Sequence, residues 1–126
     1  MISGSRTATT GEDAKRLTAE IEKLQPTHIL TGGAIGADEI AKNWAKQNNC
    51  PTTIIKPDYQ RHGKAATHQR NDELIKQADS VLCYYATTDG SKTAGTASVA
   101  HKAAKQKKLI AEIYRAIPTV QQISLF

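Results

Sequence analysis

Residues 28–45 read HILTGGAIGADEIAKNWA, and this stretch decides the fold. A short apolar segment, His28 to Thr31, runs into Gly32-Gly33, and an apolar pattern at helical spacing begins after Asp38. The order predicts a strand, a glycine turn and a helix. Glycine lets the backbone approach a ligand closely, and the helix directs free N–H groups at the same point. Such a turn can bind a phosphate, although it can equally be a tight connection between strand and helix.

Strand and helix patterns alternate along the rest of the chain. Besides 28–31, strands are expected at 1–3, 52–55, 80–85 and 109–113, with helices between them. The strand at 80–85 is apolar throughout, which is typical of a parallel strand buried on both faces. The alternating order predicts an α/β fold in three layers, with a mostly parallel five-stranded sheet and helices on both faces.

The 126 residues and their ordinary composition favour one domain, residues 1–113, followed by a C-terminal tail, 114–126. No stretch is apolar enough to cross a membrane and the polar start is unlike a signal peptide, so a cytoplasmic location is expected. Two distant cysteines and four scattered histidines predict neither a disulfide framework nor a metal site. The net charge is +5, with most of the excess in residues 101–126. Such lysines can attract nucleic acid, but more often they solvate a helix face.

Ligands of open α/β sheets bind beyond the carboxyl ends of the strands. Four loops leave that edge, and each has residues suited to an anion or a ribose: 4–6, 32–38, 57–71 and 89–96. Arg6 and Arg70 can bind phosphate oxygens, although Arg70 can instead pair with Asp72 or Glu73. Asp38 and Thr96 can each contact a ligand or cap a helix.

Several motifs in these loops resemble those of the YspA-like branch of the SLOG superfamily. They are GSR at 4–6, GGAIGAD at 32–38, PDY at 57–59, GKAATHQRN at 63–71 and AGT at 94–96. The superfamily also contains the cytokinin-activating LOG phosphoribohydrolases and the DNA-processing Smf proteins. The resemblance implies a Rossmann-like fold, a nucleotide or nucleotide-derived ligand, and a homodimer. The ligand-lining positions that it implies are Gly4, Ser5, Arg6, Gly32, Gly33, Gly36, Asp38, Arg70, Asn71, Gly95 and Thr96.

One departure from the LOG pattern bears on catalysis. Val99 stands where the PGG-x-GT-x-x-E motif of LOG hydrolases has its glutamate, and valine can neither stabilise an oxocarbenium charge nor move a proton. The sequence therefore favours a sensor or sequestering protein that needs no cofactor beyond its nucleotide-like ligand. The alternative is a hydrolase that cleaves the N-glycosidic or phosphate bond, with Arg70 and either Asp38 or Asp89 as candidate catalytic residues.

The end of the chain suggests a further alternative. Gln122, Leu125 and Phe126 belong to a QISLF segment that is similar to the short peptides with which bacterial replication proteins bind the sliding clamp. A DNA-associated module would use this contact together with the basic residues before it. An apolar end can also pack against its own domain or a twin subunit.

Overall fold

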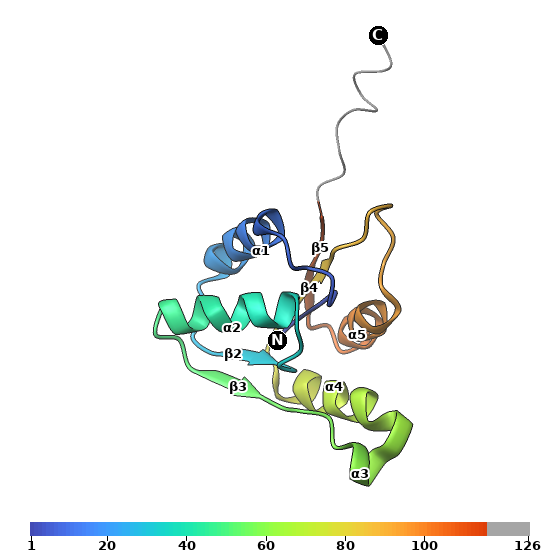
Figure 1. Cartoon of the computed structure of the whole chain (residues 1–126). Helices are drawn as coiled ribbons and strands as arrows, with labels where there is room; N and C mark the ends of the chain where they lie inside the picture. The colour runs from blue at the N-terminus through green and yellow to red at the C-terminus, as the bar shows by residue number, and fades with distance from the viewer. Residues whose placement is uncertain (116–126) are drawn as a thin grey trace.

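The computed structural model describes residues 1–115, in which strands and helices alternate (Figure 1). Five of the helices are α-helices, and a short 3-10 helix, η1, follows the third of them. In chain order the elements are β1 (Ile2–Gly4), α1 (Gly11–Leu24), β2 (Ile29–Thr31), α2 (Ala37–Gln47), β3 (Thr52–Ile54), α3 (Tyr59–His62), η1 (Gly63–Ala65), α4 (Ala66–Gln77), β4 (Val81–Tyr85), α5 (Ala94–Lys105) and β5 (Leu109–Tyr114).

The strands form two parallel sheets, one in the order β1-β4-β5 and one of β2 and β3. The predicted α/β fold with parallel strands is confirmed, but the single five-stranded sheet is wrong. β1 and β2 contact each other without a hydrogen-bonded ladder. Alternate residues of a strand direct their N–H and C=O groups to opposite sides. β1 and β2 have three residues each, so a strand already paired on one side has few groups left for the other.

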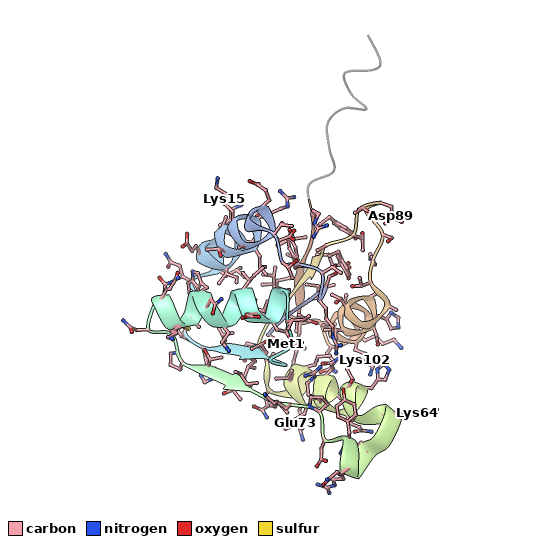
Figure 2. All side chains as sticks on the ribbon, viewed as in Figure 1. Met1, Lys15, Lys64, Glu73, Asp89 and Lys102 are labelled. Carbon is pink, nitrogen blue, oxygen red and sulfur yellow. The ribbon has the colours of Figure 1, made fainter. Side chains whose placement is uncertain are left out.

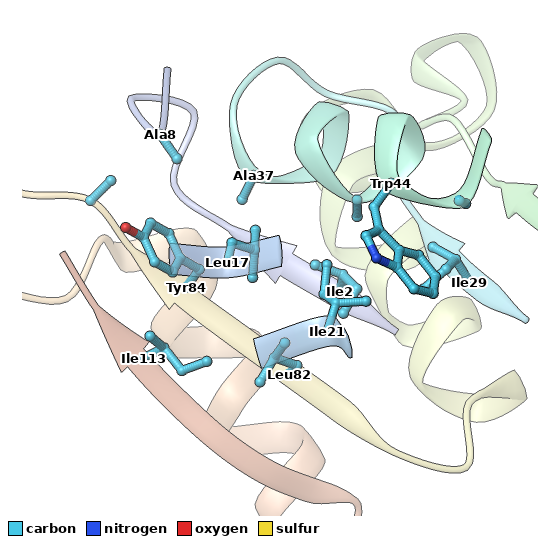
Figure 3. Close-up of a cluster of buried hydrophobic side chains, with 13 residues drawn as sticks. Ile2, Ala8, Leu17, Ile21, Ile29, Ala37, Trp44, Leu82, Tyr84 and Ile113 are labelled. Carbon is cyan, nitrogen blue, oxygen red and sulfur yellow. The ribbon is translucent and has the colours of Figure 1, made fainter. Parts of the chain in front are cut away.

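Helices cover both faces of the three-stranded sheet, and β4 shows how. Leu82 and Tyr84 lie in a buried cluster with residues of α1 and α2 (Figure 3). Val81, Cys83 and Tyr85 lie in a second cluster with residues of α4 and α5. Successive side chains of a strand point to opposite faces, so the unbroken apolar run serves two cores. The predicted burial of this strand on both faces is confirmed.

Local signals account for the start of α1. Thr10 is the N-cap, its hydroxyl accepts from the Asp13 N–H at 3.1 Å, and the Asp13 carboxylate accepts from the Thr10 N–H at 3.2 Å. This is the capping box that Thr9-Thr10 followed by acidic residues predicts. The sequence does not reveal α3 or η1, which lie in the expected loop 57–71, and α5 starts at Ala94, inside the expected loop 89–96.

β5 continues to Tyr114, and Arg115 is paired with Asp13. The predicted clamp-binding residues Gln122, Leu125 and Phe126 lie outside the described residues, so that contact and the division into domain and tail stay predictions. Within residues 1–115, no helix has the length and apolar character needed to span a bilayer.

Candidate ligand-binding cleft

A cleft of about 390 Å³ opens where β1 and β2 end and α4 and α5 begin. It brings together nine of the residues that the sequence assigns to a ligand: Gly4, Ser5, Arg6, Gly32, Asp38, Arg70, Asn71, Gly95 and Thr96. The cleft is also lined by residues that the sequence does not single out: Met1, Ile2, Ser3, Thr7, Ala34, Thr67 and Thr93. Of these, only Thr93 could have been found from the sequence, because a threonine shortly before a helical pattern is a candidate N-cap and therefore marks the start of a helix.

A larger cavity, about 510 Å³, lies where the strands begin and has no lysine or arginine in its lining. Most of its wall is apolar, with Leu24 and Ile110 on it. The cationic and glycine-bearing loops therefore meet at the cleft and not in this larger cavity.

Three predicted site residues, Gly33, Gly36 and Asp89, are not in the lining of the cleft. Gly36 has φ +85° and packs against the backbone of Ser5 and Arg6, and Gly33 has φ +71° and packs against Ile54. These two glycines permit close packing of the chain on itself. Asp89 is exposed on the loop that precedes α5 (Figure 2), and the Val99 side chain is 1% exposed in the core between α5 and β4.

Ser5 joins the starts of two helices. Its carbonyl accepts from the Ala37 N–H of α2 at 3.2 Å, and its hydroxyl lies 3.0 Å from the Thr93 hydroxyl before α5. The Ser5 Oγ also accepts from the Ala86 N–H at 3.0 Å. The side chain is 2% exposed, so its first role in the structure is to hold the cleft together.

The first turn of α5 faces the cleft without a cap. Thr93 is the N-cap by its backbone angles, φ −67° and ψ 139°, but its hydroxyl bonds to Ser5 and does not cap the helix. The N–H groups of Ala94, Gly95 and Thr96 have no hydrogen-bond acceptor in the described part of the chain, as expected of a first turn without a capping side chain. Thr96 is therefore not the N-cap that the sequence allowed.

Two further features of this turn suit an anion. No acidic residue lies in it, and a Cβ added at Gly95 would meet nothing within 4 Å. Thr96 is 5% exposed and lines the cleft, yet its hydroxyl makes no hydrogen bond to residues 1–115. The turn thus offers several donors to whatever occupies the cleft.

Arg70 forms hydrogen bonds that connect the loops around the cleft. Its Nη1 donates to the carbonyl of Gly32 at 2.9 Å and to that of Ile55 at 3.3 Å, and its Nε donates to Asn71 Oδ1 at 2.7 Å. A Cβ at Gly32 would lie 2.6 Å from the guanidinium carbon, so this glycine makes room for the arginine. The predicted alternative, a surface pair with Asp72 or Glu73, is wrong: Arg70 forms no ion pair within residues 1–115, Asp72 pairs with Lys102 at 2.7 Å, and Glu73 accepts from Gln77 at 2.9 Å.

The charges of Arg70 and Asp38 influence each other. Burial lowers the pKa of Arg70, and the Asp38 charge opposes that effect. Among the residues described, Arg70 Nη2 has no acceptor, so this part of the guanidinium stays available in the cleft. Arg6 is exposed at the cleft and takes part in no ion pair of the described chain.

Asp38 is the one carboxylate in the cleft lining and is 8% exposed. It is not the N-cap of α2, which is Gly36; its Oδ2 accepts from the Ala34 N–H at 3.2 Å. The Thr31 hydroxyl and the Gly32 N–H also lie close enough to favour its ionised form. Burial raises the pKa of Asp38, whereas the Ala34 hydrogen bond and the Arg70 charge pull it back.

In the part of the chain that the structure covers, no three His, Cys, Asp or Glu side chains are grouped to hold a metal ion. The catalytic candidates Asp38 and Arg70 lie in the cleft, whereas Asp89 does not. The arrangement offers hydrogen-bond donors at α5, cations at Arg6 and Arg70, and one acceptor at Asp38.

Comparison with known proteins gives one match. Residues 1–62 match the family model YAcAr, described as the YspA, cpYpsA-related SLOG family. The comparisons with curated proteins and with solved structures give no match. The matched segment contains GSR and GGAIGAD and ends within α3, so it carries the β1 and β2 loops of the cleft. The match over residues 1–62 supports the YspA-like branch of the SLOG superfamily, which the motifs of the chain predict.

Proposed function

We propose that the cleft binds a nucleotide or nucleotide-derived small molecule, with the phosphate at the first turn of α5. One observation carries the proposal. The Thr93 hydroxyl is hydrogen-bonded to Ser5 and does not cap α5, so the N–H groups of that turn are free in the described structure. Backbone N–H groups at a helix start, together with the helix dipole, favour a bound anion. The match of residues 1–62 to the SLOG family supports a nucleotide-related function.

The charges around the turn support the same assignment. A phosphate monoester carries close to two negative charges at neutral pH, and arginine is suited to hold its oxygens. Arg6 lines the cleft and is free of ion pairs in residues 1–115, so its charge is available to such a group. The cleft volume of about 390 Å³ falls within the range of small-molecule sites, roughly 300–1,000 Å³.

The role that fits these features is a sensor or a sequestering protein. Val99 occupies the position of the LOG glutamate, and it is buried in the core against β4. No carboxylate from α5 lines the cleft. A bound nucleotide would therefore meet no acid at the position from which the LOG hydrolases act.

The test is a substitution that changes charge without steric conflict. Gly95→Asp places a carboxylate in the first turn of α5, where a Cβ has free space and where an acidic residue favours the helix. We expect the variant to fold at least as stably as the parent and to lose the thermal stabilisation that nucleoside 5′-phosphates give the parent. Gly95→Ala should keep that stabilisation, because it adds a methyl group and no charge.

Gly11→Asp is the matched control, since Gly11 also has free space and lies in the first turn of α1, outside the cleft. It should leave ligand stabilisation unchanged. The proposal fails if no nucleoside 5′-phosphate stabilises the parent protein, or if Gly95→Asp responds to the ligand as Gly95→Ala does.

A hydrolase is the second candidate, and the raised pKa of Asp38 favours it, because a general acid works best when its pKa lies near the working pH. Incubation of the protein with nucleoside 5′-monophosphates, followed by chromatography, separates the two functions. Free base, free phosphate or ribose phosphate that forms with the parent but not with Asp38→Asn would establish the hydrolase. Binding without any of these products supports the sensor or sequestering role.

A further inference from the structure

The cleft combines an anion site with a carboxylate, and this combination restricts how a ligand can lie in it. Asp38 is nine-tenths buried, lines the cleft and, in the described structure, accepts one hydrogen bond within 3.5 Å, from Ala34 to Oδ2. An ionised carboxylate only accepts hydrogen bonds, and it repels a phosphate. The part of the ligand that faces Asp38 must therefore carry hydrogen-bond donors and no negative charge.

The carboxylate and the first turn of α5 are close neighbours. Ala37, which precedes Asp38, donates to the Ser5 carbonyl at 3.2 Å, and Thr93, which precedes the turn, bonds to the Ser5 hydroxyl at 3.0 Å. Asp38 and the first turn of α5 thus each follow directly after a residue that is hydrogen-bonded to Ser5. Both parts also line the same cleft, so one small ligand can contact them together.

We propose that Asp38 accepts hydrogen bonds from the ribose hydroxyls of the ligand, and that the cleft therefore selects ribonucleotides over nucleotides without these hydroxyls. The inference rests on the proposed binding of a 5′-phosphate at α5. In a nucleoside 5′-phosphate the 2′ and 3′ hydroxyls are the neutral donors a few bonds from the phosphate. A metal cation is a poorer match for Asp38, because no second carboxylate lines the cleft and Arg70 lies nearby.

The surroundings of Asp38 prepare it for this role. Ala34 holds Oδ2 at 3.2 Å and so fixes the orientation of the carboxylate. The Arg70 guanidinium is held by the carbonyls of Gly32 and Ile55, and no ion pair within 4.0 Å joins it to Asp38 in residues 1–115. Asp38 is consequently an oriented carboxylate that forms no ion pair, so its acceptor capacity is not taken up by Arg70.

Calorimetric titration with the four ribonucleoside 5′-monophosphates and their 2′,3′-dideoxy counterparts tests the inference on the unmodified protein. We expect the ribonucleotide of the preferred base to bind about 10- to 100-fold more tightly than its dideoxy form, as for hydrogen bonds to a charged group. Equal affinities would overturn this inference and leave the proposed phosphate site standing. Absence of binding by both series would overturn both.

Asp38→Asn then tests the residue. The amide oxygen can still accept from Ala34, and the charge is removed, so the preference for ribose should fall to within about threefold while dideoxynucleotide binding persists. That persistence also reports that the variant folds. Glu39→Gln makes the same change at the next residue, outside the cleft lining, and should keep the full preference. An undiminished preference in Asp38→Asn would overturn the inference.

Discussion

Arg115 Nη2 lies 2.7 Å from Asp13 Oδ2, and this ion pair joins the residue after β5 to the first turn of α1. Asp13 is fully buried and also accepts from the Tyr84 hydroxyl at 2.8 Å. Burial alone would raise the pKa of Asp13, but hydrogen bonds from Arg115, Tyr84 and Thr10 hold that pKa well below its usual range. Arg115 also donates to the carbonyl of Thr7, which lines the cleft, so the pair helps to hold one cleft wall.

Removal of the arginine should destabilise the fold. Arg115→Ala leaves the buried Asp13 carboxylate without its cation, and we expect the free energy of unfolding in urea to fall by about 2–3 kcal/mol at pH 7. The loss should shrink below about pH 4, because a depressed carboxyl pKa stabilises the fold only while the carboxyl is ionised in the unfolded chain.

Lys23→Ala is the control for that measurement. It removes the exposed pair of Lys23 with Glu20, and such pairs contribute about 0–1 kcal/mol. If Arg115→Ala lost no more stability than Lys23→Ala, the proposed role of the buried pair would be wrong.

Substitutions of Gly36 and Gly63 distinguish the cost of a steric clash from the cost of backbone strain. The two have similar dihedral angles, φ +85° and ψ −129° for Gly36 and φ +54° and ψ −128° for Gly63. A Cβ at Gly63 would meet nothing within 4 Å, whereas one at Gly36 would meet the Arg6 carbonyl oxygen at 2.6 Å. Gly63→Ala should cost about 1–3 kcal/mol through strain alone, and Gly36→Ala should cost more because strain and overpacking combine.

Urea unfolding of both variants checks this prediction. Equal losses would show that the chain around Ser5 and Arg6 yields to the added methyl group. The close packing of Gly36 would then not be required for the fold.

The sequence predicts most elements because their local signals agree with the final fold. The capping residues before α1, the glycine turn before α2 and the apolar run of β4 each have one dominant physical cause. The division into two sheets has no such signal, since it depends on how few backbone groups β1 and β2 have for a second neighbour. The start of α4 also cannot be predicted from the sequence, because its N-cap is Ala65 and no side chain caps the helix.

The candidate site was predictable to a similar degree. The rule that ligands bind at the carboxyl ends of strands correctly places Arg6, Arg70 and Gly95 on one cleft. It fails for Gly33 and Gly36, because glycine is required both where a backbone approaches a ligand and where it approaches another segment of chain. The sequence cannot tell these two uses apart without the tertiary contacts.

Asp38 should destabilise the protein at neutral pH. Burial raises its pKa in the folded state above that of the unfolded chain, so ionisation favours unfolding. We expect Asp38→Asn to have a higher free energy of unfolding than the parent at pH 7. The difference should decrease as the pH falls through the folded-state pKa and vanish below the unfolded value, about 3.9.

Chemical denaturation of parent and variant between pH 7 and pH 3.5 tests this sign. Glu39→Gln, on the exposed side of α2, should show no comparable gain. A variant less stable than the parent at pH 7 would mean that the charged hydrogen bond to Ala34 outweighs the desolvation of the carboxylate.

Arg6 should contribute to ligand affinity without contributing to stability. It is exposed, lines the cleft and makes no ion pair within residues 1–115, so Arg6→Gln should leave the free energy of unfolding within about 0.5 kcal/mol of the parent. The affinity for a nucleoside 5′-phosphate should fall by about 10-fold, and the difference from the parent should narrow as salt screens the charge.

Arg61→Gln is the matched variant for this last measurement, because Arg61 is an exposed arginine on the short helix α3 and does not line the cleft. Both variants reduce the net charge of the chain by the same amount. If titration calorimetry gave equal affinity losses for the two, the arginine would act through the overall charge of the protein. A loss confined to Arg6→Gln would instead locate the phosphate beside Arg6, between β1 and the first turn of α5.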